Sequence, residues 1–121
     1  MRPFLRHKFV ATFLLITTII IATNIDMKIT YDTVKNSKNI EERGLSFDMV
    51  ADIDWGTALI IEDIRKDYGE RRFRVFGYIG DRLYIAVITP RNGAIHVISL
   101  RKANNREVNE YGNNKTESIP D

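Results

Sequence analysis

The sequence predicts an α+β domain in which helices pack on one face of a four-stranded antiparallel sheet. Three observations support this prediction. Apolar residues follow a helical spacing up to Gly56, alternate as in strands from there to Leu100, and then return to a helical spacing. Gly80-Asp81 and Pro90-Arg91-Asn92-Gly93 are hairpin-type turn signals. With 44% apolar and 28% charged residues, the composition is that of an ordinary globular protein with one modest core.

The first helix is expected after a short strand or lead-in at Met27–Asp32. Asp32 is well placed as the N-cap of this helix, which should run to about Arg43. Gly44 then stands at a typical left-handed C-terminal position. The apolar face of the helix is thin, and its main anchors are expected to be Val34 and Ile40.

A second, short helix is expected to begin at Ser46 and to fray before Trp55-Gly56. Its apolar residues are three and four positions apart, which is typical of a helix face that packs against a core. They are Phe47, Val50 and Ala51, with Met49 and Ile53 widening the stripe on one side.

Four β-rich runs follow, and their close spacing predicts an antiparallel meander. The runs are Ala58–Ile61, Arg71–Ile79, Arg82–Thr89 and Ala94–Leu100. A last helix is expected over Arg101–Tyr111. Residues 27–111 would then form the domain, and residues 112–121 a polar, disordered tail.

The charge is distributed unevenly along the chain. Residues 27–64 contain four Lys/Arg and eight Asp/Glu, residues 65–106 contain ten and three, and residues 107–121 contain one and four. A basic middle between acidic ends is consistent with an anion-binding face, although solvated strand and loop charges would give the same pattern.

Several classes of site are excluded or not expected. The chain has no cysteine, which excludes disulfides and thiolate metal sites and fits a reducing cytosol. With two histidines in the whole chain, a structural zinc site is not expected. The acidic residues are scattered, with no paired set typical of a metal-dependent nuclease, and neither a nucleophile elbow nor a P-loop occurs. No cofactor is therefore predicted.

The second predicted strand carries the clearest chemical signal. Alternation places Arg72, Arg74, Phe76 and Tyr78 on one face, and Phe73, Val75, Gly77 and Ile79 on the other. The second set belongs to the core. In the first set, arginine forks match phosphate oxygens and aromatic rings can stack on RNA bases. The alternative is an exposed sheet face with arginines that only cover apolar surface.

The junction between the last strand and the last helix is a second candidate site. Arg101 and Lys102 stand where free backbone N–H groups of a new helix could also meet a phosphate. Ala103, Glu107 and Tyr111 share one helix face, which by itself could be a packing ridge. On the last strand, His96 is either structural or a general acid or base. It is the only histidine after Met27, so a two-histidine ribonuclease arrangement is excluded.

From Ile29 to Tyr111 the chain resembles the BrnT-type ribonuclease toxins of type II toxin–antitoxin pairs. At the start, Asp32, Lys35, Asn39, Gly44 and Phe47 keep the family spacing, with Tyr31 in place of a tryptophan and Arg43 in place of a histidine. In the middle, Gly69-Glu70-Arg71-Arg72-Phe73 followed by Gly77 resembles the arginine-bearing strand of the family. At the end, the family pattern is matched by Ser99, Arg101, Lys102, Ala103, Glu107 and Tyr111, while Leu100 and His96 replace alanine and arginine.

This resemblance implies a RelE-like fold, RNA cleavage and inhibition of translation. It also implies a ribbon-helix-helix antitoxin as partner, through which the complex would bind operator DNA. For metal-independent cleavage we expect Arg72 and Arg101 to clamp the phosphate and Lys102 to support them. The candidates for proton transfer are Glu70, His96 and Tyr111. The alternatives are a non-catalytic module that binds antitoxin or RNA, and a membrane-tethered small protein.

The first 26 residues lie outside the family pattern. Phe9–Thr23 is uncharged and follows Arg2, Arg6 and Lys8, which is the layout of a signal peptide. The run is shorter than the roughly 20 residues of a spanning helix, and no good cleavage site follows it. Three interpretations stay open: a start codon assigned too early, a membrane-directed segment, or a buried apolar element. Translation from Met27 would give a cytoplasmic protein without membrane contact.

Overall fold

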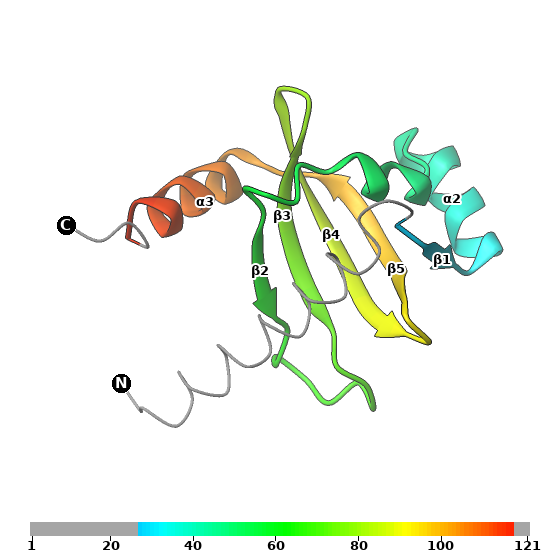
Figure 1. The fold of residues 1–121 in the computed structure, drawn as a ribbon. Helices are drawn as coiled ribbons and strands as arrows, with labels where there is room; N and C mark the ends of the chain where they lie inside the picture. Colours follow the sequence, from blue (N-terminus) through cyan, green and yellow to red (C-terminus); the bar gives the residue numbers. More distant parts are fainter. Residues whose placement is uncertain (1–26, 118–121) are drawn as a thin grey trace.

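The computed structural model describes residues 27–117, which form an α+β fold around a mixed five-stranded sheet with the strand order β1-β5-β4-β3-β2 (Figure 1). The strands are β1 (Ile29–Tyr31), β2 (Leu59–Glu62), β3 (Phe73–Ile79), β4 (Arg82–Arg91) and β5 (Ala94–Lys102). β1 pairs with β5 in parallel, and all other neighbouring strands are antiparallel.

The expected four-stranded antiparallel sheet is therefore wrong in strand number and in one direction. The short strand or lead-in predicted at Met27–Asp32 is present as β1, but its three residues carry no signal of the strand with which it pairs. Its partner residues Ile95, His96 and Val97 lie 66 positions further along the chain. The expected hairpin turns between β3 and β4 and between β4 and β5 are confirmed. In the second turn Asn92 and Gly93 have φ of 53° and 76°, the positive values that a tight two-residue turn requires.

Helix α2 (Thr33–Arg43) begins and ends where the sequence predicted. The Asp32 carboxylate accepts hydrogen bonds from the backbone N–H groups of Val34 and Lys35 at 2.9 and 3.0 Å, and Gly44 has a φ of 70°. The expected apolar anchors are wrong, because Val34 is 75% exposed and Ile40 is 45% exposed. The buried residue of α2 is Asn39, whose amide donates to the carbonyl oxygens of Leu45 and Leu100. Polar contacts, not an apolar stripe, attach this helix to β5.

The second predicted helix is a 3₁₀ helix, η1 (Phe47–Asp52), rather than an α-helix. Its predicted N-cap is confirmed, since Ser46 Oγ accepts a hydrogen bond from the N–H of Asp48. Phe47, Val50 and the following Ile53 are buried, whereas Ala51 is exposed. The tighter winding of a 3₁₀ helix places residues three apart on one side, which selects Phe47, Val50 and Ile53 from the predicted stripe.

The main core lies between η1 and one face of the sheet. It includes Phe73 and Val75 of β3, which are 1% and 0% exposed, together with residues of every other strand. Ile53 packs so closely on β3 that a Cβ on Gly77 would lie 2.4 Å from Ile53 Cγ2. A glycine is therefore required where η1 crosses this strand.

Helix α3 (Asn105–Glu117) packs on the opposite face of the sheet, at one end of it (Figure 1). It covers a second apolar cluster formed by Phe76, Leu83, Ile85 and Ala103, with Val108 and Tyr111 contributed by the helix region itself. Helices thus lie on both faces, not on one. Together with the fifth strand and the 3₁₀ helix, this means that the expected RelE-like order of elements does not match in detail.

The boundaries at the C-terminal end also differ from the prediction. β5 continues through Arg101 and Lys102, and α3 begins only at Asn105. The helix then extends to Glu117, so residues 112–117 are helical rather than a disordered tail. The apolar run Phe9–Thr23 lies outside the described residues. Between residues 27 and 117, no helix is both long and apolar enough to cross a membrane.

Candidate functional site

The sheet face that carries α3 continues beyond that helix as a polar surface, here called the polar face. Strand register arranges its side chains in rows. Arg74, Val87 and Ser99 form one row across β3, β4 and β5, and Thr89, His96 and Thr30 form the next across β4, β5 and β1. A bulge at Val87/Ile88 separates the two rows. Because alternate residues share a face, Arg72 and Arg91 extend the polar face at the ends of β3 and β4.

Glu70 joins two arginines at this end of the polar face. Its carboxylate oxygens accept hydrogen bonds from Arg72 Nε at 3.2 Å and from Arg91 Nη2 at 2.9 Å. The hydrogen bond from Arg91 is the main cause that lowers the pKa of Glu70. Burial of the carboxylate raises this pKa, and Arg72 lowers it further. The Arg72 guanidinium also lies over the Tyr68 ring, 4.3 Å from its centroid. The result is an ionised carboxylate that holds two guanidinium groups in place.

His96 belongs to the same electrostatic cluster. Its Nδ1 lies 2.8 Å from the Thr30 hydroxyl, which ties β5 to β1 within the site. Burial is the main cause that lowers the pKa of His96, and the positive charges of Arg91 and Lys35 lower it further against Glu70 and Asp32. The imidazole is therefore neutral at pH 7 and has the form required of a proton acceptor.

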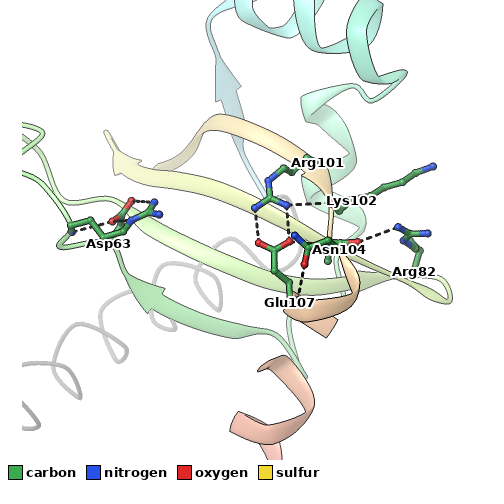
Figure 2. A network of polar contacts seen from close by, with 8 residues as sticks. Asp63, Arg82, Arg101, Lys102, Asn104 and Glu107 are labelled. Carbon is green, nitrogen blue, oxygen red and sulfur yellow. Dashed lines mark hydrogen bonds and ion pairs between the residues drawn. The ribbon is translucent and has the colours of Figure 1, made fainter. Parts of the chain in front are cut away.

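The predicted site at Arg101 has a different environment. Arg101 donates to both carboxylate oxygens of Glu107, at 2.7 and 2.6 Å (Figure 2). The expected free N–H groups at the start of α3 are also engaged. Asn104 and Glu107 exchange two hydrogen bonds as a reciprocal cap, with Asn104 Oδ1 accepting from the Glu107 N–H at 2.9 Å and Glu107 Oε1 from the Asn104 N–H at 3.0 Å. Arg101 lowers the pKa of Glu107 to about 2. A carboxylate of the protein itself thus occupies the anion position at this junction.

The family model described as the ribonuclease toxin BrnT of type II toxin–antitoxin systems matches residues 31–107, from β1 to the first turn of α3. The chain belongs to the BrnT family. No curated protein matches the chain.

This BrnT chain brings together only part of the residue set predicted from the sequence. Glu70, Arg72 and His96 lie in one cluster. Arg101 of β5 is paired with Ile85 of β4, whereas His96 is paired with Thr89. Ile85 and Thr89 are four residues apart on β4, so Arg101 lies about 13 Å from the row of His96. The side chain of Lys102 points away from the Arg101–Glu107 pair (Figure 2). Lys102 is paired in the sheet with Tyr84, whose side chain packs in the main core on the other face. The Tyr111 hydroxyl donates to the carbonyl oxygen of Thr57 at 2.7 Å.

The aromatic half of the predicted RNA-binding face is wrong. Phe76 is fully buried in the cluster beneath α3, and the Tyr78 ring packs edge-on against Tyr111 with centroids 5.6 Å apart. These rings stabilise α3 on the sheet, so they are not free to stack on bases. Nevertheless, the assignment of Arg72 and Arg74 to the face opposite Phe73 is confirmed.

Sequence reasoning missed Arg91, Thr30 and Tyr68 as members of the site. Arg91 was included in a turn signal, although its position two residues after Thr89 places it on the polar face. Thr30 becomes part of the site only through the parallel pairing of β1 with β5. Tyr68 lies in the β2–β3 loop, where spacing carries no information about contacts.

Two further observations limit the chemistry. Among the described residues, no group of three or more His, Asp or Glu side chains is arranged to hold a metal ion. Arg43, which stands where the BrnT pattern has a histidine, donates to Asn39 Oδ1 at 2.8 Å and more weakly to the carbonyl oxygen of Leu100. This residue attaches α2 to β5 and takes a structural role.

Proposed function

We propose that the protein is a metal-independent endoribonuclease whose active centre is the cluster of Glu70, Arg72, Arg91 and His96 on the polar face. The observation that carries this proposal is that the imidazole of His96, hydrogen-bonded to Thr30, shares one partly exposed surface with two guanidinium groups held by Glu70. RNA supplies its own nucleophile, the 2′-hydroxyl, so such a centre needs a base and cations but no further reactive group.

In the proposed reaction, His96 accepts the proton of the 2′-hydroxyl as its oxygen attacks phosphorus. The bond between phosphorus and the 5′-oxygen breaks as this oxygen takes a proton from water, which leaves a 2′,3′-cyclic phosphate and a 5′-hydroxyl end, and the protonated His96 then returns its proton to the solvent. The hydrogen bond at Nδ1 to Thr30 directs the other ring nitrogen, Nε2, toward the substrate. Arg72 and Arg91 stabilise the charge that develops on the phosphate oxygens, and removal of one such donor costs about 100- to 1,000-fold in rate.

The other predicted residues take supporting roles in this proposal. Glu70 positions the two arginines, because a carboxylate held ionised by them does not donate a proton. Arg101 positions α3 through Glu107, and Tyr111 attaches the same helix to the chain near β2. Lys102 remains a candidate for contact with more distant RNA phosphates.

The test is cleavage of labelled RNA by the purified full-length chain in the presence of EDTA. We expect products with 2′,3′-cyclic phosphate ends, no cleavage of a DNA strand of the same sequence, and loss of cleavage in His96→Ala. Lys38→Gln, an exposed charge change on α2, serves as the control and should cleave normally. Cleavage that EDTA abolishes, or that His96→Ala retains, would contradict the proposal.

The family also supports a proposal about biology. We infer that the toxin acts on cytoplasmic RNA, inhibits translation, and is neutralised by a ribbon-helix-helix antitoxin through which the pair binds its operator. The second candidate function, a module that binds an antitoxin without catalysis, predicts that the chain binds the product of the neighbouring gene but does not cleave RNA. Controlled expression with and without that gene separates the two: only a nuclease arrests growth and depletes RNA when expressed alone.

A further inference from the structure

Arg74 is distinguished from the other arginines of the polar face by its lack of an ionic partner. Arg72 and Arg91 share the carboxylate of Glu70, and Arg101 is paired with Glu107. The side chain of Arg74 makes no hydrogen bond or ion pair with any residue between 27 and 117. Its guanidinium instead lies 5.6 Å from the centroid of the Phe76 ring.

The head group of Arg74 is also partly removed from water. Its Nε is buried and has no hydrogen-bond partner. In the strand register, Arg74 lies between Ile61 of β2 and Val87 of β4, so apolar side chains flank it on both sides. A buried donor without a partner is costly, and a cation in apolar surroundings interacts strongly with any anion that reaches it. The residue as a whole is only partly buried, and its terminal nitrogens are the part left to meet a ligand.

We propose that Arg74 is a phosphate-binding residue for the RNA strand, adjacent to the active centre. This inference rests on the proposed function of the polar face and adds to it the position that anchors the substrate. Arg74 and Arg72 are two residues apart on β3, which separates their positions along the strand by about 7 Å. Arg72 and Arg91 share the single carboxylate of Glu70 and Arg74 has no ionic partner, so the three guanidinium groups give this surface a surplus of positive charge.

The repeated charge of this surface favours a nucleic acid over an acidic protein segment as the occupant. A strand of RNA presents a phosphate at every nucleotide, and a groove lined with several cations follows such a backbone. Ser99 in the row of Arg74 and His96 in the next row add neutral hydrogen-bonding groups where the sugar and the reacting phosphate would lie. A phosphate on Arg74 would therefore hold the strand beside the imidazole.

The experiment measures binding separately from cleavage. A fluorescent RNA with 2′-O-methyl groups lacks the nucleophile, so it binds without being cut. Its affinity for the full-length chain, free of antitoxin, is measured by anisotropy at several salt concentrations for the unmodified protein, Arg74→Gln, Arg74→Lys, His96→Ala and the control Lys38→Gln.

We expect Arg74→Gln to weaken binding about 10- to 100-fold, the loss typical of a hydrogen-bonded charge. One lost phosphate contact should also reduce the slope of log affinity against log salt by about 0.7. Arg74→Lys should recover part of the affinity but not the fork geometry. Lys38→Gln should bind within about twofold of the unmodified protein, whereas His96→Ala, which removes a neutral hydrogen-bonding group, should weaken binding less than Arg74→Gln and leave the salt dependence unchanged. Melting temperatures check folding, and if Arg74→Gln does not fold, Arg74→Lys gives the decisive comparison.

Unchanged RNA affinity in Arg74→Gln would overturn the proposal. If only Arg74→Lys folds, unchanged RNA affinity in that variant would overturn the proposal. Failure of the unmodified protein to bind this RNA would overturn it too. Normal RNA affinity with loss of antitoxin binding would reassign Arg74 to the protein interface and overturn it as well. A chain that binds RNA through Arg74 but cuts no RNA would refute the nuclease mechanism and leave the phosphate site standing.

Discussion

The ionisation of His96 depends on its burial and on Arg91, and this dependence can be measured. Because the pKa of the imidazole lies below its usual 6.5, the neutral base persists at mildly acidic pH. Cleavage should therefore decline only when the pH falls through this lowered pKa. Arg91→Gln removes a positive charge that disfavours the imidazolium, so the pKa should rise and the acidic limb of kcat/KM should move to higher pH. The profile from about pH 5 to 8 tests this. A limb that does not move would exclude His96 as the base.

The ion pair between Arg101 and Glu107 should stabilise the protein in a defined pH range. The pKa of Glu107 is about 2 in the folded protein, against an ordinary value of 4.5. A lowered carboxyl pKa gives stability that is complete above the unfolded value and is lost as the pH falls from about 4.5 toward 2. Glu107→Gln should thus be less stable at pH 7 and should lose less stability on acidification. Urea unfolding at pH 7 and pH 3 provides the comparison, with Glu110→Gln on the exposed side of α3 as control.

At the scale of elements, the loop between β2 and β3 is organised by one buried carboxylate. Asp63 accepts hydrogen bonds from Arg65 Nε at 2.8 Å, Arg65 Nη2 at 2.9 Å and the Tyr68 hydroxyl at 3.0 Å. The hydrogen bond from Arg65 is the main cause that holds the pKa of Asp63 far below its usual range. Since the Tyr68 ring lies under Arg72, the loop connects Asp63 to the proposed active centre.

Asp63→Asn should therefore reduce RNA cleavage by loosening Arg72, with a fall in kcat larger than any change in the affinity for uncleavable RNA. Amide hydrogen exchange should increase in residues 64–71 and remain slow in β4 and β5. Asp81→Asn, at the exposed β3–β4 turn, should change neither property. Faster exchange throughout the sheet would mean that Asp63 supports the whole fold rather than the loop.

The two faces of β3 should respond differently to truncation. Phe73→Ala removes a side chain that is 1% exposed and should lower the free energy of unfolding by about 3–5 kcal/mol. Arg72→Ala should change this quantity little, because its ion pair is partly solvated, while cleavage falls by about 100-fold or more. Chemical denaturation beside cleavage assays separates the effects. A large loss of stability in Arg72→Ala would show that the polar face carries part of the core.

Local rules predicted the elements that are defined within a few residues. The caps at Asp32 and Ser46, the turn at Asn92-Gly93 and the alternation of β3 all depend on neighbours in sequence, and all are confirmed. The burial of Phe76 was not predictable, because it depends on where α3 docks some thirty positions later. The exposure of Val34 and Ile40 follows from an amide, Asn39, being the group that attaches α2.

The candidate site was predictable to a similar extent. Strand alternation identified Arg72, residue type identified His96, and the resemblance to the BrnT family included Glu70; the fold brings the three together. Spacing alone placed Arg101 at a helix start, whereas the true start at Asn105 allows Glu107 to reach back to it. The contact of Thr30 with His96 was not predictable, because it depends on a strand pairing between residues 66 positions apart, and no local sequence pattern reports such a pairing.

For the molecule as a whole, residues 27–121 should fold without the preceding segment. Among the described residues 27–117, side chains between Met27 and Tyr111 form two apolar clusters, one on each face of the sheet. Circular dichroism and thermal melting of this shorter chain should show a cooperative transition. An unfolded product that is rescued by restoring Phe9–Thr23 would show that the apolar run completes the fold. Rescue by an antitoxin alone would not count against the prediction, because a bound partner stabilises any folded state.

The parallel pairing of β1 with β5 has a consequence for the order of events during synthesis. β1 leaves the ribosome first, but its partner strand is among the last segments to be made. The antiparallel β3–β4–β5 hairpins close short loops and can form early, whereas β1 must wait for a contact of long sequence separation. The hydroxyl of Thr30 reaches the imidazole of His96 only in that final step. A nascent or truncated chain that ends before β5 therefore contains Thr30 but lacks His96. The cell that makes the toxin meets the proposed catalytic centre only after β5 has been translated.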